Sequence, residues 1–109
     1  QEESSIDIRK RVASAREKQN TRFNTKTISR NNANMTKADM NHFCKLSKSS
    51  AELIEMAMNK LHLSARAYDR ILKVARTIAD LDQKATIERN HVAEAIQYRA
   101  LDKMNQYFA

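Results

Sequence analysis

The amino-acid sequence predicts an all-α protein, a compact bundle of about five helices. None of its 109 residues is glycine or proline. Tight β-hairpin turns need positive φ angles, which glycine adopts at the lowest cost, so a sheet of short strands is disfavoured. Apolar residues also recur three and four positions apart through most of the chain, which is the period of a helix with one buried face.

The first part of the chain predicts two helices separated by the longest irregular segment. A pair of serines can cap a helix over residues 5–20,. Its predicted inward residues are Ile8, Val12 and Ala15,. Residues 20–34 are rich in Asn and Thr, which favour turns over helix interiors. Thr36 and Asp39 then resemble a capping box that opens a short helix ending near residue 46,.

The middle of the chain predicts two further helices, capped by Ser47 and Ser64,. The second of these carries apolar residues over half of its circumference, which predicts a central helix packed by more than one neighbour. Its inward residues are predicted to be Tyr68, Ile71, Leu72, Val74, Ala75, Ile78, Ala79 and Leu81. The opposite, solvent-facing half is predicted to hold Arg66, Asp69, Arg70, Lys73, Arg76, Thr77 and Asp80.

The last part of the chain predicts a loop over residues 82–87 and a final helix from about residue 89 through residue 101,. Residues 104–109 either continue this helix or form a frayed tail. A chain of this length makes one domain of typical size, so residues 1–109 are expected to form a single helical domain.

Several classes of site are excluded or disfavoured by composition. Without glycine, neither the phosphate-binding loop GxxxxGK[ST] nor the dinucleotide fingerprint GxGxxG can occur. No apolar run exceeds three residues, which excludes a membrane span, and we expect a soluble, cytoplasmic protein. Cys44 has no second cysteine to pair with and follows Phe43. It is therefore predicted to be a small buried hydrophobic residue.

No metal site or catalytic constellation is predicted. The three histidines, His42, His62 and His91, lie twenty or more residues apart and form neither an HExxH motif nor an i, i+4 pair,. Each is predicted to be a surface or capping residue. The acidic residues are scattered among basic neighbours, and no Ser, His and Asp set can be assigned. We therefore predict no catalytic residue in this chain.

Arg66 is the first candidate for a functional role. It follows the predicted cap Ser64 by two residues, so it puts a positive charge in the first turn of a helix, where the helix dipole disfavours cations by about 0.3–1 kcal/mol,. A helix N-terminus with an adjacent guanidinium suits the binding of phosphate oxygens. The alternative is a solvated arginine paired with Asp69 three residues later.

Three segments carry a resemblance to a known family. Residues 63–81 read LSARAYDRILKVARTIADL, residues 91–103 read HVAEAIQYRALDK, and residues 4–23 read SSIDIRKRVASAREKQNTRF. Together they resemble the C-terminal domain of magnesium-chelatase-like AAA+ ATPases of the bacterial competence protein ComM type. The resemblance covers about residues 4–103, nearly the whole chain, and it implies a lid-like helical fold.

In that family this domain is the helical lid that follows the ATPase core, and the arginine of the LSAR motif is the sensor 2 residue that contacts the γ-phosphate of ATP. The resemblance therefore implies a sensor 2 role for Arg66, with Arg70 on the same face as a secondary candidate. Walker motifs, metal-binding carboxylates and the arginine finger belong to the core and are missing here. The chain is therefore expected to be the C-terminal lid of a longer ATPase and to hydrolyse no ATP alone.

The resemblance also implies cofactors and partners. ATP and Mg²⁺ would be bound by the full-length parent, with none expected on this fragment. The implied partners are the ATPase core of the same chain and the neighbouring subunits of a ring, as in a hexamer, with no membrane. The parent is expected to act in DNA uptake or recombination.

The charge of the chain supports an alternative function. The formal net charge is +7, and residues 1–30 hold eight Lys or Arg against four Asp or Glu. A basic surface of this kind attracts nucleic acid non-specifically. Basic and acidic residues are mixed along every predicted helix, however, and a solvated charged surface explains most of the excess. The alternative is a free-standing basic helical module that binds nucleic acid.

Overall fold

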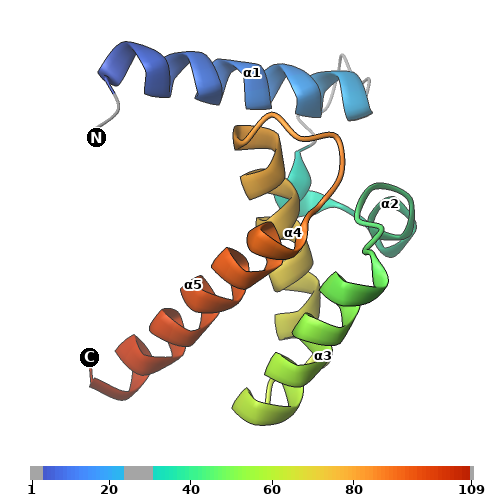
Figure 1. Cartoon of the computed structure of the whole chain (residues 1–109), viewed down its shortest axis with the longest axis vertical. Coiled ribbons are helices and arrows are strands. Elements are labelled where there is room, and N and C mark those ends of the chain that lie inside the picture. The colour runs from blue at the N-terminus through green and yellow to red at the C-terminus, as the bar shows by residue number, and fades with distance from the viewer. Residues whose placement is uncertain (1–3, 24–30, 109) are drawn as a thin grey trace.

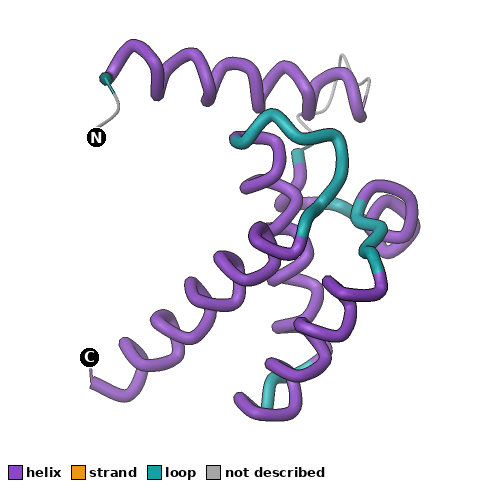
Figure 2. The backbone as a smooth tube through the Cα atoms, in the orientation of Figure 1, coloured by secondary structure: helices purple, strands orange, loops and turns teal. Residues whose placement is uncertain are grey.

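The computed structural model describes residues 4–23 and 31–108, with side chains placed as far as residue 99. These residues form α-helices and one short 3₁₀ helix and contain no strand. The elements are α1 (Ser5–Phe23), η1 (Asn32–Asn34), α2 (Lys37–Phe43), α3 (Lys48–Leu61), α4 (Ala65–Leu81) and α5 (Arg89–Phe108). Their arrangement is shown in Figure 1, and Figure 2 marks the loops that join them. The predicted all-α fold class is confirmed.

Three helix starts are set by local caps that the sequence predicts. The hydroxyl of Thr36 accepts a hydrogen bond from the backbone N–H of Asp39, and the Asp39 carboxylate accepts one from the N–H of Thr36, which completes a capping box,. The hydroxyl of Ser47 accepts from the N–H of Ser50 at the start of α3. Ser64 accepts in the same way from the third residue of α4, at 3.2 Å,.

Two predicted helix ends are wrong. α1 continues to Phe23 instead of ending at residue 20. Its last turn is held by Phe23, which is buried, and by Arg22, which is bonded to α4, so tertiary contacts override the turn preference of the Asn and Thr residues,. α2 ends at Phe43, with Cys44 as its C-cap, before the predicted end near residue 46. Residues 24–30 of the predicted irregular segment lie outside the described residues.

α4 is the central helix of the fold, as predicted. It contacts α1, η1, α2 and α5, and α3 packs against α5. Figure 1 shows α5 crossing α4, while α1 lies across the end of α4. The buried core is formed by Phe23, Met35, Met40, Cys44, Ile54, Ile71, Leu72, Ala75, Ala79, Ile87, Val92 and Ala95.

The structure corrects the predicted faces of two helices. On α4, Arg76 and Asp80 are buried although their charge predicted a solvent-facing position, and Val74 is exposed although it was predicted inward. The reason is that α1 and η1 cover Asp80, while the end of α2 and the loop after α4 cover Arg76. On α1, Ala15 is buried as predicted, but Ile8 and Val12 are 45% and 37% exposed.

Two non-glycine residues have positive φ angles, one at the end of α3 and one just after α4. His62, the C-cap of α3, has φ 52° and ψ 49°, and Gln83, just after α4, has φ 58°. Glycine is the usual residue at such helix ends, and this chain has none. No helix in the described part of the chain is both long and apolar enough to cross a membrane.

Candidate functional site

Arg66 lies at the second position of α4, two residues after the Ser64 cap, and its side chain is exposed. The predicted alternative, an ion pair with Asp69, is not formed. The Asp69 carboxylate instead accepts a hydrogen bond from Lys37 Nζ at 2.9 Å. Within the described residues Arg66 makes no ion pair. The start of α4 therefore presents a guanidinium to solvent beside backbone N–H groups that have no intrahelical acceptor.

Arg70 lies one turn after Arg66 and is also exposed. It borders a shallow groove of about 380 Å³ between α4 and α5. The other walls of this groove are Val74, Tyr98 and Arg99, with Ile71 and Ala95 at its base. The structure thus places the two predicted site residues on one face of α4.

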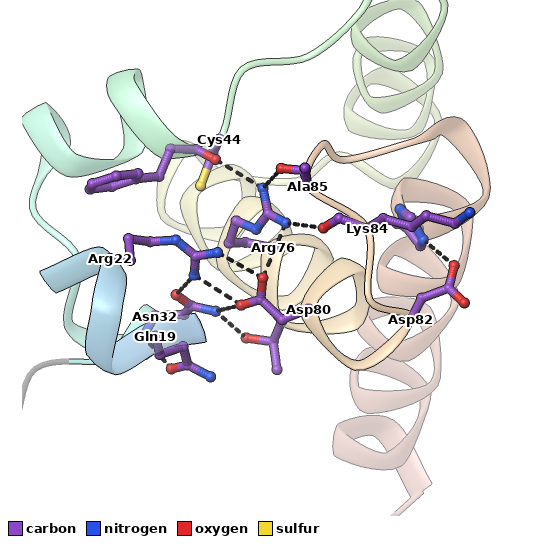
Figure 3. A network of polar contacts seen from close by, with 12 residues as sticks. Gln19, Arg22, Asn32, Cys44, Arg76, Asp80, Asp82, Lys84 and Ala85 are labelled. Carbon is purple, nitrogen blue, oxygen red and sulfur yellow. Dashed lines mark hydrogen bonds and ion pairs between the residues drawn. The ribbon is translucent and has the colours of Figure 1, made fainter. Parts of the chain in front are cut away.

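A second polar cluster lies at the opposite end of α4 and is buried. The Asp80 side chain is fully buried, and its two oxygens accept hydrogen bonds from Arg22 Nη2 at 2.7 Å and Arg22 Nη1 at 2.9 Å (Figure 3). Asn32 Nδ2 donates to the same carboxylate at 2.9 Å. Arg76 Nη2 lies 3.1 Å from it, one turn earlier on α4. Asp80 therefore joins α1, η1 and α4.

The pKa of Asp80 reflects this environment. Burial by itself raises the pKa of a carboxyl group, but the hydrogen bonds from Arg22 and Asn32 and the charges of Arg76 and Arg22 outweigh that effect,. The pKa of Asp80 is consequently lowered below its usual value, and the group is a carboxylate at neutral pH. A buried charge of this kind is tolerated because it is both paired and hydrogen-bonded.

Arg76 extends the cluster to the loop that follows α4. Its guanidinium donates hydrogen bonds to the carbonyl oxygens of Lys84 at 2.9 Å, Ala85 at 3.0 Å and Phe43 at 3.3 Å. Burial lowers the pKa of Arg76, and the Asp80 charge opposes the shift. The side chain therefore fixes the end of α2 and the loop before α5 against α4. Among the described residues, Arg76 Nε is a buried nitrogen without a hydrogen-bond partner. The carboxylate of Asp80 and the terminal nitrogens of Arg76 are bonded internally, so the cluster is a structural element.

Arg22 and Asn32 complete the cluster on the α1 side. Arg22 Nη1 also donates to Asn32 Oδ1 at 2.8 Å, and the guanidinium lies 5.7 Å from the centre of the Phe43 ring,. The Asn32 backbone N–H donates to Gln19 Oε1 at 3.0 Å, and Asn32 Nδ2 also bonds Thr77 Oγ1 at 3.1 Å. η1 is thereby bonded to both α1 and α4.

His91 has a structural role at the start of α5. The sequence predicted that His91 is either a surface residue or a capping residue. The side chain is buried, so the surface prediction is wrong, and it caps α5, so the capping prediction is confirmed. Its Nδ1 accepts a hydrogen bond from the backbone N–H of Glu88 at 2.9 Å, and its Nε2 lies 2.8 Å from Asp82 Oδ2. The hydrogen bond with His91 lowers the pKa of Asp82. His42 and His62 are exposed.

The fold brings together three residues of types that can bind a metal ion, and their spacing in the sequence did not indicate this. Atoms of Asp82, Glu88 and His91 lie within 4.8 Å of one another. Both ring nitrogens of His91 are already engaged, however, one by a backbone N–H and the other by Asp82. The geometry therefore fits a helix cap.

Cys44 is buried, as predicted. Its Sγ lies 3.9 Å from Met35 Sδ in the core. Burial raises the pKa of the thiol to about 11, against the lowering effect of the Arg76 and Arg22 charges. A thiol with this pKa carries very little thiolate at neutral pH and is chemically inert.

The described helices, with a capped and cationic start to α4, define a small all-α domain. The chain belongs to the family described as magnesium chelatase, subunit ChlI C-terminal, which it matches over residues 2–99. This finding confirms the family resemblance that the sequence motifs carry.

Two relatives show how much of a longer protein the chain represents. Uncharacterized protein YifB of Escherichia coli K12 is 44% identical over 102 residues, which cover 94% of this chain and 19% of that protein. Competence protein ComM of Haemophilus influenzae is 42% identical over 104 residues, which cover 95% of this chain and 19% of that protein. The chain therefore spans about a fifth of the length of the curated relatives it matches.

Proposed function

We propose that this chain is the helical lid of a longer magnesium-chelatase-like AAA+ ATPase and that Arg66 is its sensor 2 residue. The observation that carries the proposal is the exposed guanidinium of Arg66 at the capped N-terminus of α4. Asp69, the nearest predicted partner, is bonded to Lys37 and leaves Arg66 available for an anion. The family match over residues 2–99 supports the same assignment.

In the proposed mechanism, ATP and Mg²⁺ are bound mainly by the ATPase core, and this chain contributes a cation at the γ-phosphate. Arg66 would donate charge-assisted hydrogen bonds to phosphate oxygens, whose negative charge the start of α4 also favours. Arg70, one turn later on the same face, is a secondary candidate for such a contact. Because both arginines belong to α4, which packs against four other elements, nucleotide state would be coupled to the position of the whole lid and of neighbouring ring subunits.

The parent is further proposed to act on DNA, in uptake or recombination. The name of one relative, competence protein ComM, supports this proposal. The alternative is that the chain binds nucleic acid directly through its basic surface, for which its charge of +7 is the supporting observation. These functions differ in salt response, because a protein that neutralises several phosphates loses affinity steeply as salt rises.

The test is the variant Arg66→Ala in the longer protein and in this chain alone. Loss of one charge-assisted bond is worth about 1.5–3 kcal/mol, so kcat for ATP hydrolysis should fall about 10- to 100-fold. The melting temperature of the isolated chain should stay unchanged or rise slightly, because a cation leaves the first turn of α4. The two readouts thus separate a role at the nucleotide from a role in stability.

The matched control is Lys48→Ala. Lys48 is likewise an exposed cation in the first turn of a serine-capped helix, here α3. It should share the small gain in stability and leave ATP hydrolysis unchanged. Normal hydrolysis by the Arg66→Ala protein would refute the sensor 2 role. Salt-sensitive binding of DNA to the isolated chain, measured at two salt concentrations, would favour the alternative function.

A further inference from the structure

An apolar stripe on α1 continues past the part of the helix that the rest of the domain covers. Ile8, Val12 and Ala15 are spaced four and three residues apart, so they lie on one face of the helix. Gln19 and Phe23 extend the same face toward the end of α1. These last residues are docked: Phe23 is buried in the core and Gln19 accepts a hydrogen bond from η1.

The amino-terminal half of the stripe has no covering element in the described structure. Ala15 is 3% exposed, whereas Val12 and Ile8, one and two turns earlier, are 37% and 45% exposed. Figure 1 shows this half of α1 extending past the end of α4. A surface hollow of about 450 Å³ lies along it, lined in part by Ile8 and Val12. The periodicity that buries the second half of α1 therefore presents an apolar face to solvent in the first half.

Charge restricts what can cover this face. Arg9 and Arg16 are exposed along one border of the stripe and line the same hollow, together with one acidic residue, Glu17. Lys18 lies on the other border of the helix face,. A second copy of this chain would bring the same arginines and another charge of +7 against the first,. The surface instead fits an apolar protein patch bordered by carboxylates.

We propose that the Ile8–Val12 face of α1 docks on the ATPase core of the longer protein. The proposal rests on the function proposed above, because it requires a core in the same molecule. About four fifths of the length of the curated relatives lies outside the region that matches this chain, which leaves room for such a partner. The contact would position the lid through α1, at the end of the domain opposite Arg66, while Arg66 contacts the nucleotide through α4.

The experiment compares hydrogen exchange of the amides in residues 5–16 between the isolated chain and the longer protein. Amides at an undocked helix end exchange fast because the end opens locally at low cost. In the longer protein these amides should exchange at least about tenfold more slowly than in the isolated chain. The variants Ile8→Ser and Val12→Ser should each return the exchange to within about twofold of the isolated chain.

The control is Ile6→Ser, which makes the same chemical change on the opposite side of the same helix. Ile6 is 62% exposed and lies outside the stripe,. It should leave the slow exchange intact, and all three variants should keep the melting temperature of the isolated chain. Slow exchange that survives both stripe variants would overturn the proposal. So would protection in the isolated chain that appears with rising concentration, as for a dimer, or on addition of DNA.

The outcome is separable from the sensor 2 test. If residues 5–16 are protected in the longer protein while Arg66→Ala hydrolyses ATP normally, α1 docks and the sensor 2 assignment fails. If Arg66→Ala loses hydrolysis while exchange in residues 5–16 is equally fast in both proteins, the docking proposal fails alone.

Discussion

The buried Asp80 carboxylate offers the sharpest test of what holds the domain together. Asp80→Asn keeps the size and shape of the side chain and removes its charge. In the native protein that charge compensates two arginines, Arg22 and Arg76, which are themselves largely buried. The variant would leave both guanidinium groups next to a neutral amide, part of which is a donor that faces their own donors.

The magnitude follows from the geometry. Removing one partner of a buried ion pair typically costs about 3–5 kcal/mol. Both arginines keep other acceptors: Arg76 retains three backbone carbonyls and Arg22 retains Asn32 Oδ1. We therefore expect the lower end of that range, about 3 kcal/mol. For a domain of this size, that loss corresponds to a fall in melting temperature of about 12–24 °C.

The loss should depend on pH in a defined direction. The pKa of Asp80 is lower in the folded protein than in the unfolded chain. Its contribution to stability is therefore complete above the unfolded carboxyl pKa of about 4 and disappears as pH falls through the folded value. The difference in stability between the native protein and Asp80→Asn should be largest near neutral pH and shrink as pH is lowered below about 4.

The assay is urea unfolding followed by circular dichroism at several pH values. Asp69→Asn serves as the control, because its ion pair with Lys37 is exposed, with Lys37 at 73%. That variant should lose less than about 1 kcal/mol. If Asp80→Asn also unfolds within about 1 kcal/mol of the native protein, the buried cluster does not stabilise the fold as the geometry requires.

Two further predictions concern single buried side chains. Cys44, with its pKa raised to about 11 by burial, should resist a thiol reagent at pH 8 and react only as the protein unfolds in urea; labelling of the folded protein at the rate of a free cysteine would contradict this,. His91→Ala should cost about 1–2 kcal/mol through the lost helix cap. It should also raise the pKa of Asp82 toward its usual value, because the hydrogen bond from His91 lowers it; an unchanged Asp82 titration by NMR would count against that bond.

The helices could be predicted from the sequence because their signals are local. The caps at Thr36, Ser47 and Ser64 each act on a residue three positions away, so a short window contains the whole interaction,. The apolar stripe of α4 likewise predicted a helix with several neighbours. The position of Arg66 at a capped helix start was predicted in the same way, and its role stays a prediction.

The buried cluster could not be predicted because its partners are distant in sequence. Arg22 and Asp80 are separated by 58 positions, and nothing near either residue indicates the other. A charge on a helix is normally solvated, so Arg76 and Asp80 were assigned to water. One local signal does point to burial of Arg76 and Asp80. Apolar residues already fill half of α4, so little of its surface stays exposed to water once several neighbours pack on it.

On α1 the error has the opposite direction, because residues predicted to be buried are exposed. Ile8 and Val12 have the period of inward residues, and periodicity identifies a face made for burial without identifying what buries it. In this chain the described residues cover only the second half of that face.

The attachment of α1 through Arg22 has a consequence for how the domain opens. A helix held only by apolar contacts can loosen by degrees, since each contact is lost independently. Arg22 must leave Asp80 and Asn32 together. A partial displacement would leave the buried guanidinium of Arg22 without water and without these partners. The last turn of α1 should therefore detach from α4 in a single cooperative step, while η1 stays bonded to α4 through the contacts of Asn32 with Thr77 and Asp80. We expect the end of α1 that carries Arg22 to be either docked on α4 or fully detached from it.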